Sequence, residues 1–341
     1  MSEPTAETRM WALVRGAMTT KALGLVADLG IADRLADGPR PVAELAAETG
    51  ADEDALYRFL RALASDGVFA EEPVRTFANT PMSQLLLSDR ADSWRDVAHL
   101  FGDLWYRTFL DAEDSLSSGE PAFPATFGVD FWAWLEQHPD DGAALNRAMA
   151  SGAEQDVDPL LKVDWRDGET VVDVGGGNGA TLVALLRRRP GLSGIVFDLP
   201  ETAREAETFL ARSDLASRCR VVAGSFLETV PPGDVYLLQA ILHDWDDERA
   251  GLILRTIRSN APPRARVVIR DAVIPPGNEP HGNKWLDLLM LVLLRGRERT
   301  EEEWRRLLEA AGFDVASISD GLILATCCAT RPSYGKDQER R

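Results

Sequence analysis

The sequence predicts an α/β protein in which a doubly wound parallel sheet follows a helical module of winged-helix type. Three observations support this fold class. Short apolar runs alternate with helical stretches from about residue 164 onward, a glycine-rich loop joins the first of these runs to a helix, and amphipathic helices dominate the N-terminal region. With 341 residues and 45% hydrophobic content, the chain can bury two cores, which excludes a disordered or fibrous protein.

The N-terminal region shows apolar residues at three- and four-residue intervals, which predicts three amphipathic helices. These helices are expected over residues 22–36, 42–49 and 53–66. A short strand at 67–70, a turn and a second short strand at 76–80 follow, as in the β-wing of a winged helix. Residues 1–100 are therefore expected to form a winged-helix module.

The charge of this module favours a structural, dimerising role over DNA binding. Asp52, Glu53 and Asp54 surround the start of its third helix, on which only Arg58 and Arg61 are cationic. The whole chain carries a formal net charge of −18 and has a pI near 4.7. Because phosphate binding depends on clustered Lys and Arg, no nucleic-acid partner is expected.

Five short apolar runs, most of them rich in β-branched residues, predict the strands of the parallel sheet. They are residues 170–174, 194–197, 219–222, 235–239 and 265–270. A late strand is expected at 322–327. The predicted organisation is the winged-helix module, a helical linker that covers a pocket (101–160), the sheet domain (161–330) and a polar tail (331–341).

The cysteines and histidines indicate in which compartment the protein resides and whether it binds a metal. The cysteines are Cys219, Cys327 and Cys328, which form neither a disulfide framework nor a CxxC metal site. The first residues lack the basic start and apolar run that are typical of a signal peptide, and no apolar stretch approaches the roughly 20 residues that cross a bilayer. We therefore expect a cytoplasmic protein with no membrane partner. No metal site is expected, because three of the four histidines, His99, His138 and His281, are isolated in sequence.

A glycine loop follows the first predicted sheet strand and opens a helix expected over residues 181–188. The glycines let the backbone approach a bound nucleotide, and Asp198, 19 residues beyond Gly179, follows the next strand and suits ribose hydroxyls. Gly175 and Gly177 also match the dinucleotide fingerprint, so a dehydrogenase is one alternative. Asp173 favours S-adenosylmethionine, because its carboxylate suits a cationic amino-acid group and would repel a pyrophosphate.

The segment Leu242–Glu248, with the sequence Leu-His-Asp-Trp-Asp-Asp-Glu, carries a family resemblance when it follows such a loop. The chain resembles the small-molecule O-methyltransferases that include plant caffeate-type enzymes and bacterial enzymes tailoring antibiotics and pigments. The resemblance covers about residues 15 to 328, and the stretches 29–33 and 55–63 resemble the dimerisation module of that family. It implies a Rossmann-like catalytic domain, S-adenosylmethionine as cofactor, a homodimer, and a small aromatic or polyketide-derived acceptor.

His243 is the candidate general base. A neutral hydroxyl is a poor nucleophile, and an imidazole with an unperturbed pKa of about 6.5 can accept its proton at neutral pH. The resemblance implies that two acids, Asp271 and Glu298, flank this histidine. The family usually has Glu where this chain has Asp271, which is one methylene shorter.

The resemblance also implies a set of cofactor-binding residues. This set is Asp173, Gly175, Gly177, Asp198, Leu199, Ser225, Phe226 and Gln239. Two of its members depart from the family pattern. Ser225 stands where the family usually has Asp beside the adenine, and it can hydrogen-bond without supplying a charge. Gln239 stands where Lys or Arg is common.

The acceptor itself is not specified by the sequence. Six apolar side chains are candidates for the wall of its pocket, and they would serve equally well in packing. They are Phe131, Trp132, Met149, Trp285, Leu289 and Met290. Two alternatives to an O-methyltransferase are the dehydrogenase and a winged-helix transcriptional regulator. A third is a relative that keeps the cofactor pocket and performs decarboxylation or hydroxylation.

Overall fold

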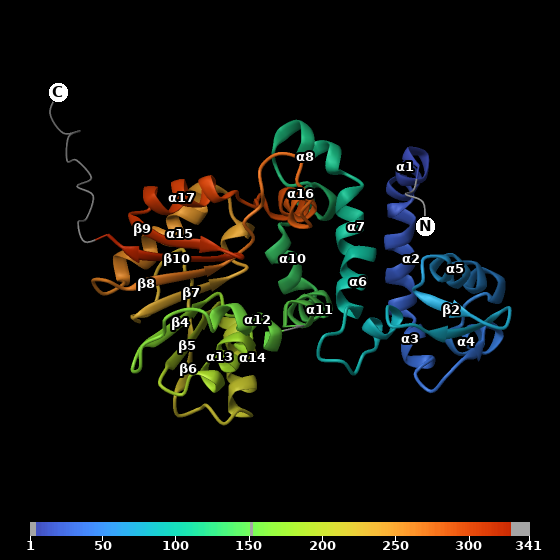
Figure 1. Cartoon of the computed structure of the whole chain (residues 1–341), viewed down its shortest axis with the longest axis horizontal. Coiled ribbons are helices and arrows are strands. Elements are labelled where there is room, and N and C mark those ends of the chain that lie inside the picture. Colours follow the sequence, from blue (N-terminus) through green and yellow to red (C-terminus); the bar gives the residue numbers. More distant parts are fainter. Residues whose placement is uncertain (1–4, 151–152, 329–341) are drawn as a thin grey trace. The chain divides into compact units, whose positions relative to one another are not determined.

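The computed structural model describes residues 5–150 and 153–328 (Figure 1). The predicted polar tail, 331–341, lies outside the described residues. The chain forms two compact units. The first comprises the described residues up to Glu113 and those from Ala122 to Ala150, and the second comprises Asp114–Pro121 and the described residues from Ala153 onward. The helical stretch that we expected as a linker, 101–160, is thus divided between the units.

The first unit begins with helices and a small antiparallel sheet. Its first elements are α1 (Ala6–Val14), α2 (Gly16–Asp28), α3 (Ile31–Arg34), β1 (Arg40–Pro41), α4 (Val42–Thr49), α5 (Glu53–Ser65), β2 (Phe69–Glu71), β3 (Thr76–Asn79) and η1 (Ser83–Leu86). The prediction of a single helix over 22–36 was wrong. This stretch forms two helices, because Gly30 adopts a left-handed backbone with φ of 60° between them.

The predicted wing is confirmed, and it packs on the helices. The β1-β3-β2 sheet is antiparallel, with Phe69 opposite Asn79. Phe69 and Phe77 turn inward from the strands and are buried with apolar residues of α2 to α5, among them Leu45 and Leu60. This core gives the N-terminal part of the unit its own stability.

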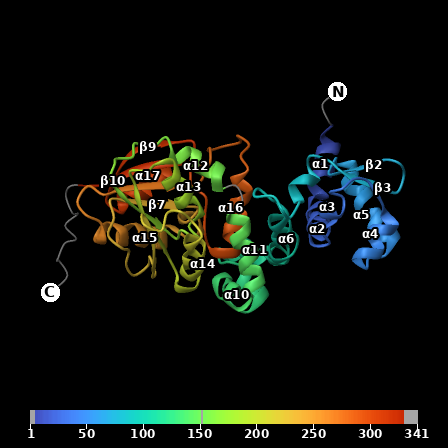
Figure 2. The same ribbon diagram turned by 90° about the horizontal axis from the view of Figure 1, so that it is seen from below.

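The remaining helices of the first unit follow the wing. They are α6 (Arg95–Gly102), α7 (Leu104–Phe109), α9 (Phe123–Phe127), α10 (Phe131–Gln137) and α11 (Pro139–Ala150), while α8 (Ala112–Ser118) spans the point of division. Helices α2 and α6 lie side by side in both views (Figures 1 and 2). Their backbones meet at Gly24 and Gly102, where a Cβ atom on Gly24 would lie 2.8 Å from the Gly102 Cα.

The second unit contains a seven-stranded sheet with the order β6-β5-β4-β7-β8-β10-β9. Its strands are β4 (Thr170–Val174), β5 (Ser193–Asp198), β6 (Cys219–Ala223), β7 (Val235–Gln239), β8 (Arg266–Arg270), β9 (Phe313–Ser319) and β10 (Leu322–Cys327). The five strands from β6 to β8 in this order are parallel, as predicted. From β4, successive strands are added first on one side (β5, β6) and then on the other (β7, β8). A ligand site is expected at the carboxyl ends of the strands at this switch point.

Helices cover both faces of this sheet. They are α12 (Ala153–Leu160), α13 (Ala180–Arg188), α14 (Pro200–Ala211), α15 (Asp247–Asn260) and α17 (Glu301–Ala310). The unit also contains α16 (Asn283–Leu294). Successive residues of a strand point to opposite faces. Val172 of β4 accordingly packs with α15 and α17, whereas Val171 packs with α12, α13 and α14. In Figure 1, α15 and α17 are seen near β9 and β10, and α13 and α14 near β5 and β6.

The far end of the sheet differs from the prediction. Strand β10 was predicted but pairs antiparallel with β8, and the edge strand β9 was not predicted. Polar or small residues separate Phe313, Val315 and Ile318 in β9, so it lacks the continuous apolar run that marks the buried strands. None of the helices in residues 5–150 and 153–328 is long and apolar enough to cross a membrane.

Candidate active site

The predicted cofactor residues of the second unit gather at the carboxyl edge of its parallel strands. Asp173 lies at the end of β4, Asp198 ends β5 and Gln239 ends β7, while Ser225 follows β6. Because parallel strands end at the same edge of a sheet, residues that are far apart in sequence meet there. The glycine loop leaves β4 at the same edge.

The glycine loop has the left-handed backbone that its glycines permit. Gly175 has φ of 72° and Gly177 has φ of 58°. A Cβ atom on Gly175 would lie 2.5 Å from Cδ1 of Ile241, so this glycine is required by close packing as well. At Gly177 nothing lies within 4 Å of a built Cβ atom. The loop therefore presents open backbone at Gly177 and is packed at Gly175.

Asp173 is a buried carboxylate that lacks a partner. Its residue is 3% exposed, and no hydrogen bond to its side chain occurs among the described residues. Burial, with a contribution from the charge of Asp198, raises the pKa of Asp173 to about 7. A buried charge without a partner is costly, so this position suits a cationic ligand group such as an ammonium.

Asp198 supports the glycine loop from the neighbouring strand. Its Oδ2 accepts a hydrogen bond of 2.8 Å from the Gly177 amide, and its Oδ1 accepts one of 2.7 Å from the Leu199 amide. Burial raises the pKa of Asp198, and these amide hydrogen bonds oppose the rise. Each carboxylate oxygen has a second lone pair, so Asp198 can still accept from ribose hydroxyls.

The remaining members of the cofactor set lie beside the loop. Ser225 Oγ accepts from the Leu227 amide at 3.3 Å, and the ring of Phe226 packs edge-on against Trp245 with 6.0 Å between centroids. Gln239 Nε2 donates to Thr181 Oγ1 at 3.4 Å, whereas Gln239 Oε1 is buried and has no partner among the described residues. Gln239 Oε1 is therefore an unsatisfied acceptor at this edge.

His243 lies on a 3₁₀ turn, η2 (Leu242–Asp244), directly after β7. Its Nδ1 lies 3.0 Å from Oε1 of Glu298, and its Nε2 lies 3.5 Å from Oδ1 of Asp244. Asp271 follows β8, and its Oδ2 accepts from the Leu242 amide at 3.2 Å. Glu298 thus contacts the imidazole, whereas the hydrogen bond of Asp271 goes to the turn that carries it.

The electrostatics of this cluster favour a protonated imidazole. Burial alone would lower the pKa of His243, but the charges of Asp244 and Asp271 and the hydrogen bond that Glu298 accepts together raise it to about 10. Burial raises the pKa of Asp271 to about 7 and that of Asp244 to about 6. The imidazole is therefore a stronger base than the unperturbed side chain that the sequence suggested.

Comparison with known protein families shows which family the chain belongs to. A family model described as an O-methyltransferase domain matches residues 109–314, which is more than half of the chain. The chain belongs to the O-methyltransferase family. A second model, the O-methyltransferase dimerisation domain, matches residues 11–89. Both the predicted family and the predicted N-terminal module are thus confirmed.

Individual O-methyltransferases resemble the chain over most of its length. It is 42% identical over 308 residues to the phenazine O-methyltransferase PhzM of Lysobacter antibioticus, covering 90% of each chain. The solved structure of the mitomycin 7-O-methyltransferase MmcR is 34% identical, with a TM-score of 0.87, and the match covers 94% of this chain and 97% of that one. The O-methyltransferase NcsB1, solved with S-adenosyl-L-homocysteine and 1,4-dihydroxy-2-naphthoic acid, is 33% identical, with a TM-score of 0.83 and coverage of 95% and 100%.

The residues expected to line the acceptor pocket of this O-methyltransferase fall in both units. Phe131, Trp132 and Met149 belong to the first unit, and Trp285, Leu289 and Met290 lie on α16 in the second. Phe131, Leu289 and Met290 are buried, while the other three are exposed. Within the described residues, no group of three or more His, Cys, Asp or Glu side chains has the arrangement of a metal site.

Sequence reasoning missed three residues beside the catalytic candidates. Asn283 Nδ2 donates to Glu298 Oε1 at 3.3 Å, and Asp287 Oδ1 accepts from the Glu298 amide at 2.7 Å. Asp244, the neighbour of His243, faces the Nε2 side of its ring. Asn283 and Asp287 are four residues apart on α16, and this spacing on one helix face was the available signal.

Proposed function

We propose that this O-methyltransferase methylates a phenolic hydroxyl of a small aromatic or polyketide-derived secondary metabolite, with S-adenosylmethionine as donor and His243 as general base. The observation that supports the assignment is the His243–Glu298 contact at the sheet edge that also holds the glycine loop. The relatives named above act on phenazine and mitomycin compounds or bind a naphthoic acid. A flat aromatic acceptor is the class that these share.

The residues at the sheet edge fit S-adenosylmethionine. The unpartnered carboxylate of Asp173 would hold the ammonium of its amino-acid part, and Asp198 would accept from the ribose hydroxyls. The open backbone at Gly177 leaves room for a nucleoside. When bound, this cofactor supplies a methyl group on a positively charged sulfur, which is the electrophile of the reaction.

His243 in its neutral form would take the proton of the acceptor hydroxyl. Proton transfer costs least when donor and base have similar pKa values, and a phenol has a pKa of about 10, close to that of His243. Glu298 holds Nδ1, so Nε2, which lies 3.5 Å from Oδ1 of Asp244, is the nitrogen that would take the proton. After the transfer, Glu298, Asp244 and Asp271 stabilise the imidazolium by their charges.

A panel screen tests the proposed function. Purified protein, S-adenosylmethionine and hydroxylated phenazines, naphthoic acids and benzoic acids would be incubated, and products analysed by mass spectrometry for the gain of one methyl group. The proposal is supported if a phenol gains a methyl group and the same compound without its hydroxyl group does not. Cofactor binding with loss of carbon dioxide or gain of oxygen instead would indicate the decarboxylase or hydroxylase alternative.

We also propose that the protein is a cytoplasmic homodimer held by the N-terminal module. Helix α1 has no buried residue, and four of its apolar side chains are more than 60% exposed: Met10, Trp11, Leu13 and Val14. Such a contiguous apolar surface is unusual on a monomer and typical of an interface. The cysteines are free, which agrees with a reducing compartment.

A further inference from the structure

We propose that Arg299 is a positioning residue that fixes the His243 turn, so that the imidazole keeps its contact with Glu298. The inference rests on the proposed function, in which His243 is the base. Arg299 does not contact the imidazole in the structure, and it acts through the backbone of the turn. It follows Glu298 directly in sequence, so the two side chains bind the same turn from one short segment.

The guanidinium of Arg299 binds the turn on both sides of His243. Its Nη1 donates to the carbonyl oxygen of Leu242 and its Nη2 to that of Trp245, each at 2.8 Å. Leu242 precedes His243, and Trp245 follows Asp244 at the end of the turn. In addition, the Arg297 amide donates to the His243 carbonyl at 2.8 Å. The segment 297–299 therefore holds three carbonyl groups of the turn.

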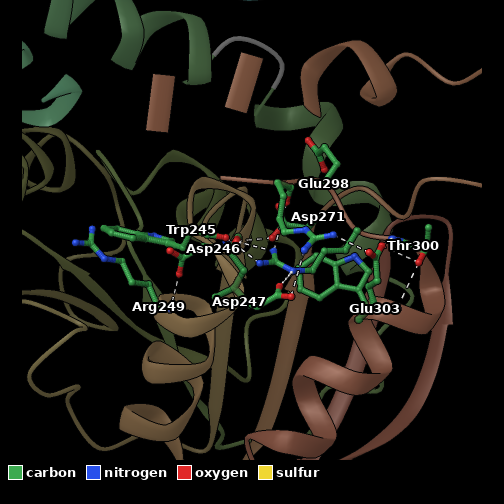
Figure 3. A network of polar contacts seen from close by, with 12 residues as sticks. Trp245, Asp246, Asp247, Arg249, Asp271, Glu298, Thr300 and Glu303 are labelled. Atoms are coloured by element: carbon green, nitrogen blue, oxygen red, sulfur yellow. Dashed lines mark hydrogen bonds and ion pairs between the residues drawn. The ribbon is translucent and has the colours of Figure 1, made fainter. Parts of the chain in front are cut away.

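Two further contacts hold the guanidinium itself, and a backbone bridge holds the residue. Nε of Arg299 donates to Asp247 Oδ1 at 2.9 Å, and the guanidinium lies over the ring of Trp304 with 5.2 Å to its centroid. Figure 3 shows Trp245, Asp247 and Glu298 around this network. The backbone of Arg299 is bridged to Val273, just beyond β8. The turn after β7 is thereby tied to the segment after β8.

The burial of Arg299 supports positioning rather than stability as its role. The residue is fully buried, and this burial lowers its pKa. A buried ion pair is weak evidence for stability, because an apolar side chain of similar volume is often as stabilising. The planar guanidinium presents separate donors to the two carbonyls and the carboxylate, and a lysine ammonium offers a similar charge without that geometry.

The test observes His243 directly by NMR of protein labelled with ¹⁵N-histidine, which requires no acceptor. The chain has four histidines, and His243→Ala assigns the signal of interest. Arg299→Lys keeps the charge and loses the fork. Arg299→Gln is made in parallel, because a buried ammonium short of partners can prevent folding. Arg266→Lys is the matched control: Arg266 pairs with Glu169 at 2.6 Å, at the opposite edge of the sheet.

We expect both Arg299 variants to change the ring ¹⁵N shifts of His243 and to lower its pKa toward the ordinary value of about 6.5, because the Glu298 contact loosens. Arg266→Lys should lower the melting temperature and leave these signals unchanged. With an acceptor that the wild-type protein methylates, kcat should fall roughly 10- to 100-fold in the Arg299 variants. The affinity for S-adenosylhomocysteine should be retained. Unchanged His243 shifts and pKa in a folded Arg299 variant would overturn the inference.

A double variant separates this inference from the proposed base role. If Arg299 acts through His243, Arg299→Lys should lower kcat little further in the His243→Ala background. Full activity of His243→Ala would reject the base role, whereas the NMR result would still decide whether Arg299 fixes the turn. An equal loss of kcat from Arg299→Lys in both backgrounds would show that Arg299 acts by another route and overturn the positioning role.

Discussion

Nδ1 of His243 lies 3.0 Å from Oε1 of Glu298, a carboxylate whose side chain has no exposed surface. The same Oε1 accepts from Asn283, and Oε2 of Glu298 has no partner among the described residues. A buried carboxylate that holds one imidazole nitrogen fixes the orientation of the ring and stabilises its protonated form. The properties of His243 therefore depend on Glu298, and several predictions about catalysis derive from this contact.

Replacing His243 by alanine should lower kcat roughly 10²- to 10⁴-fold, the usual loss when a general base is removed. The affinity for S-adenosylhomocysteine should change little, because the cofactor residues lie on other segments. Initial rates and calorimetry measure the two effects. His99→Ala, which removes an imidazole in the first unit, is the control. Full activity of His243→Ala on a phenol whose pKa lies well above the assay pH would place proton removal elsewhere.

Glu298→Gln should shift the pH dependence of kcat toward lower pH. The neutral imidazole is the active form, so activity rises as His243 loses its proton, and the raised pKa of about 10 places this limb in the alkaline range. Removing the Glu298 charge lowers the pKa of His243, and the weaker base should also lower the plateau rate. Asp271→Asn should have a smaller effect on the plateau, because the amide oxygen can still accept from Leu242. Identical profiles for wild type and Glu298→Gln would contradict the role of this contact.

Binding of S-adenosylhomocysteine should strengthen as the pH rises through about 7. In the free protein, burial holds the pKa of Asp173 near 7, up from 3.8, so the carboxyl group is protonated below this value. A cationic ammonium binds the ionised form, so binding should release a proton near neutral pH. Calorimetry in two buffers of different ionisation enthalpy measures the release. Asp173→Asn should bind more weakly and without this pH dependence, and proton release that persists in the variant would argue against Asp173.

Alanine variants of Gly175 and Gly177 should distinguish a glycine required for packing in the protein from one required for the approach of the cofactor. Both positions have a positive φ, so alanine costs on the order of 1–3 kcal/mol of backbone strain at each. Gly175→Ala should be destabilised further by the clash with Ile241, whereas Gly177→Ala meets no neighbour in the protein. Thermal unfolding should therefore show the larger loss for Gly175→Ala. Gly177→Ala should remain folded and bind S-adenosylhomocysteine more weakly; undiminished affinity would show that the cofactor does not approach this position.

A charge on α1 should dissociate the proposed homodimer. Val14 is 63% exposed, and Val14→Glu would place a carboxylate on the proposed interface. Light scattering should show a lower mass for this variant than for wild type. Leu116→Glu, at an 85% exposed position in the second unit, is the matched control and should leave the mass unchanged. A wild-type protein that is monomeric at all concentrations would contradict the dimer.

The sequence predicted the parallel strands well, because buried strands are continuous apolar runs, and β4, β7 and β10 have the predicted bounds. It could not predict β9, an edge strand without a continuous apolar run, or the direction of β10. For the site, the family resemblance suggested that Glu298 flanks His243, and the two side chains are in contact. The pKa of His243 could not be inferred, because it depends on burial and on three carboxylates that only the folded chain brings together.

The place of β10 in the sheet has a consequence for biosynthesis. This strand is late in the chain, yet it lies between β8 and β9, and the Asp271 amide donates to the carbonyl of Gly321 just before it. On the ribosome, the N-terminal module and the first strands can fold while the rest is still being translated. The segment after β8 that carries Asp271 cannot gain its partner until residues beyond 320 have left the exit tunnel. The contacts of this segment are therefore completed only after Gly321 has been translated, when incomplete chains can already contain a folded N-terminal module.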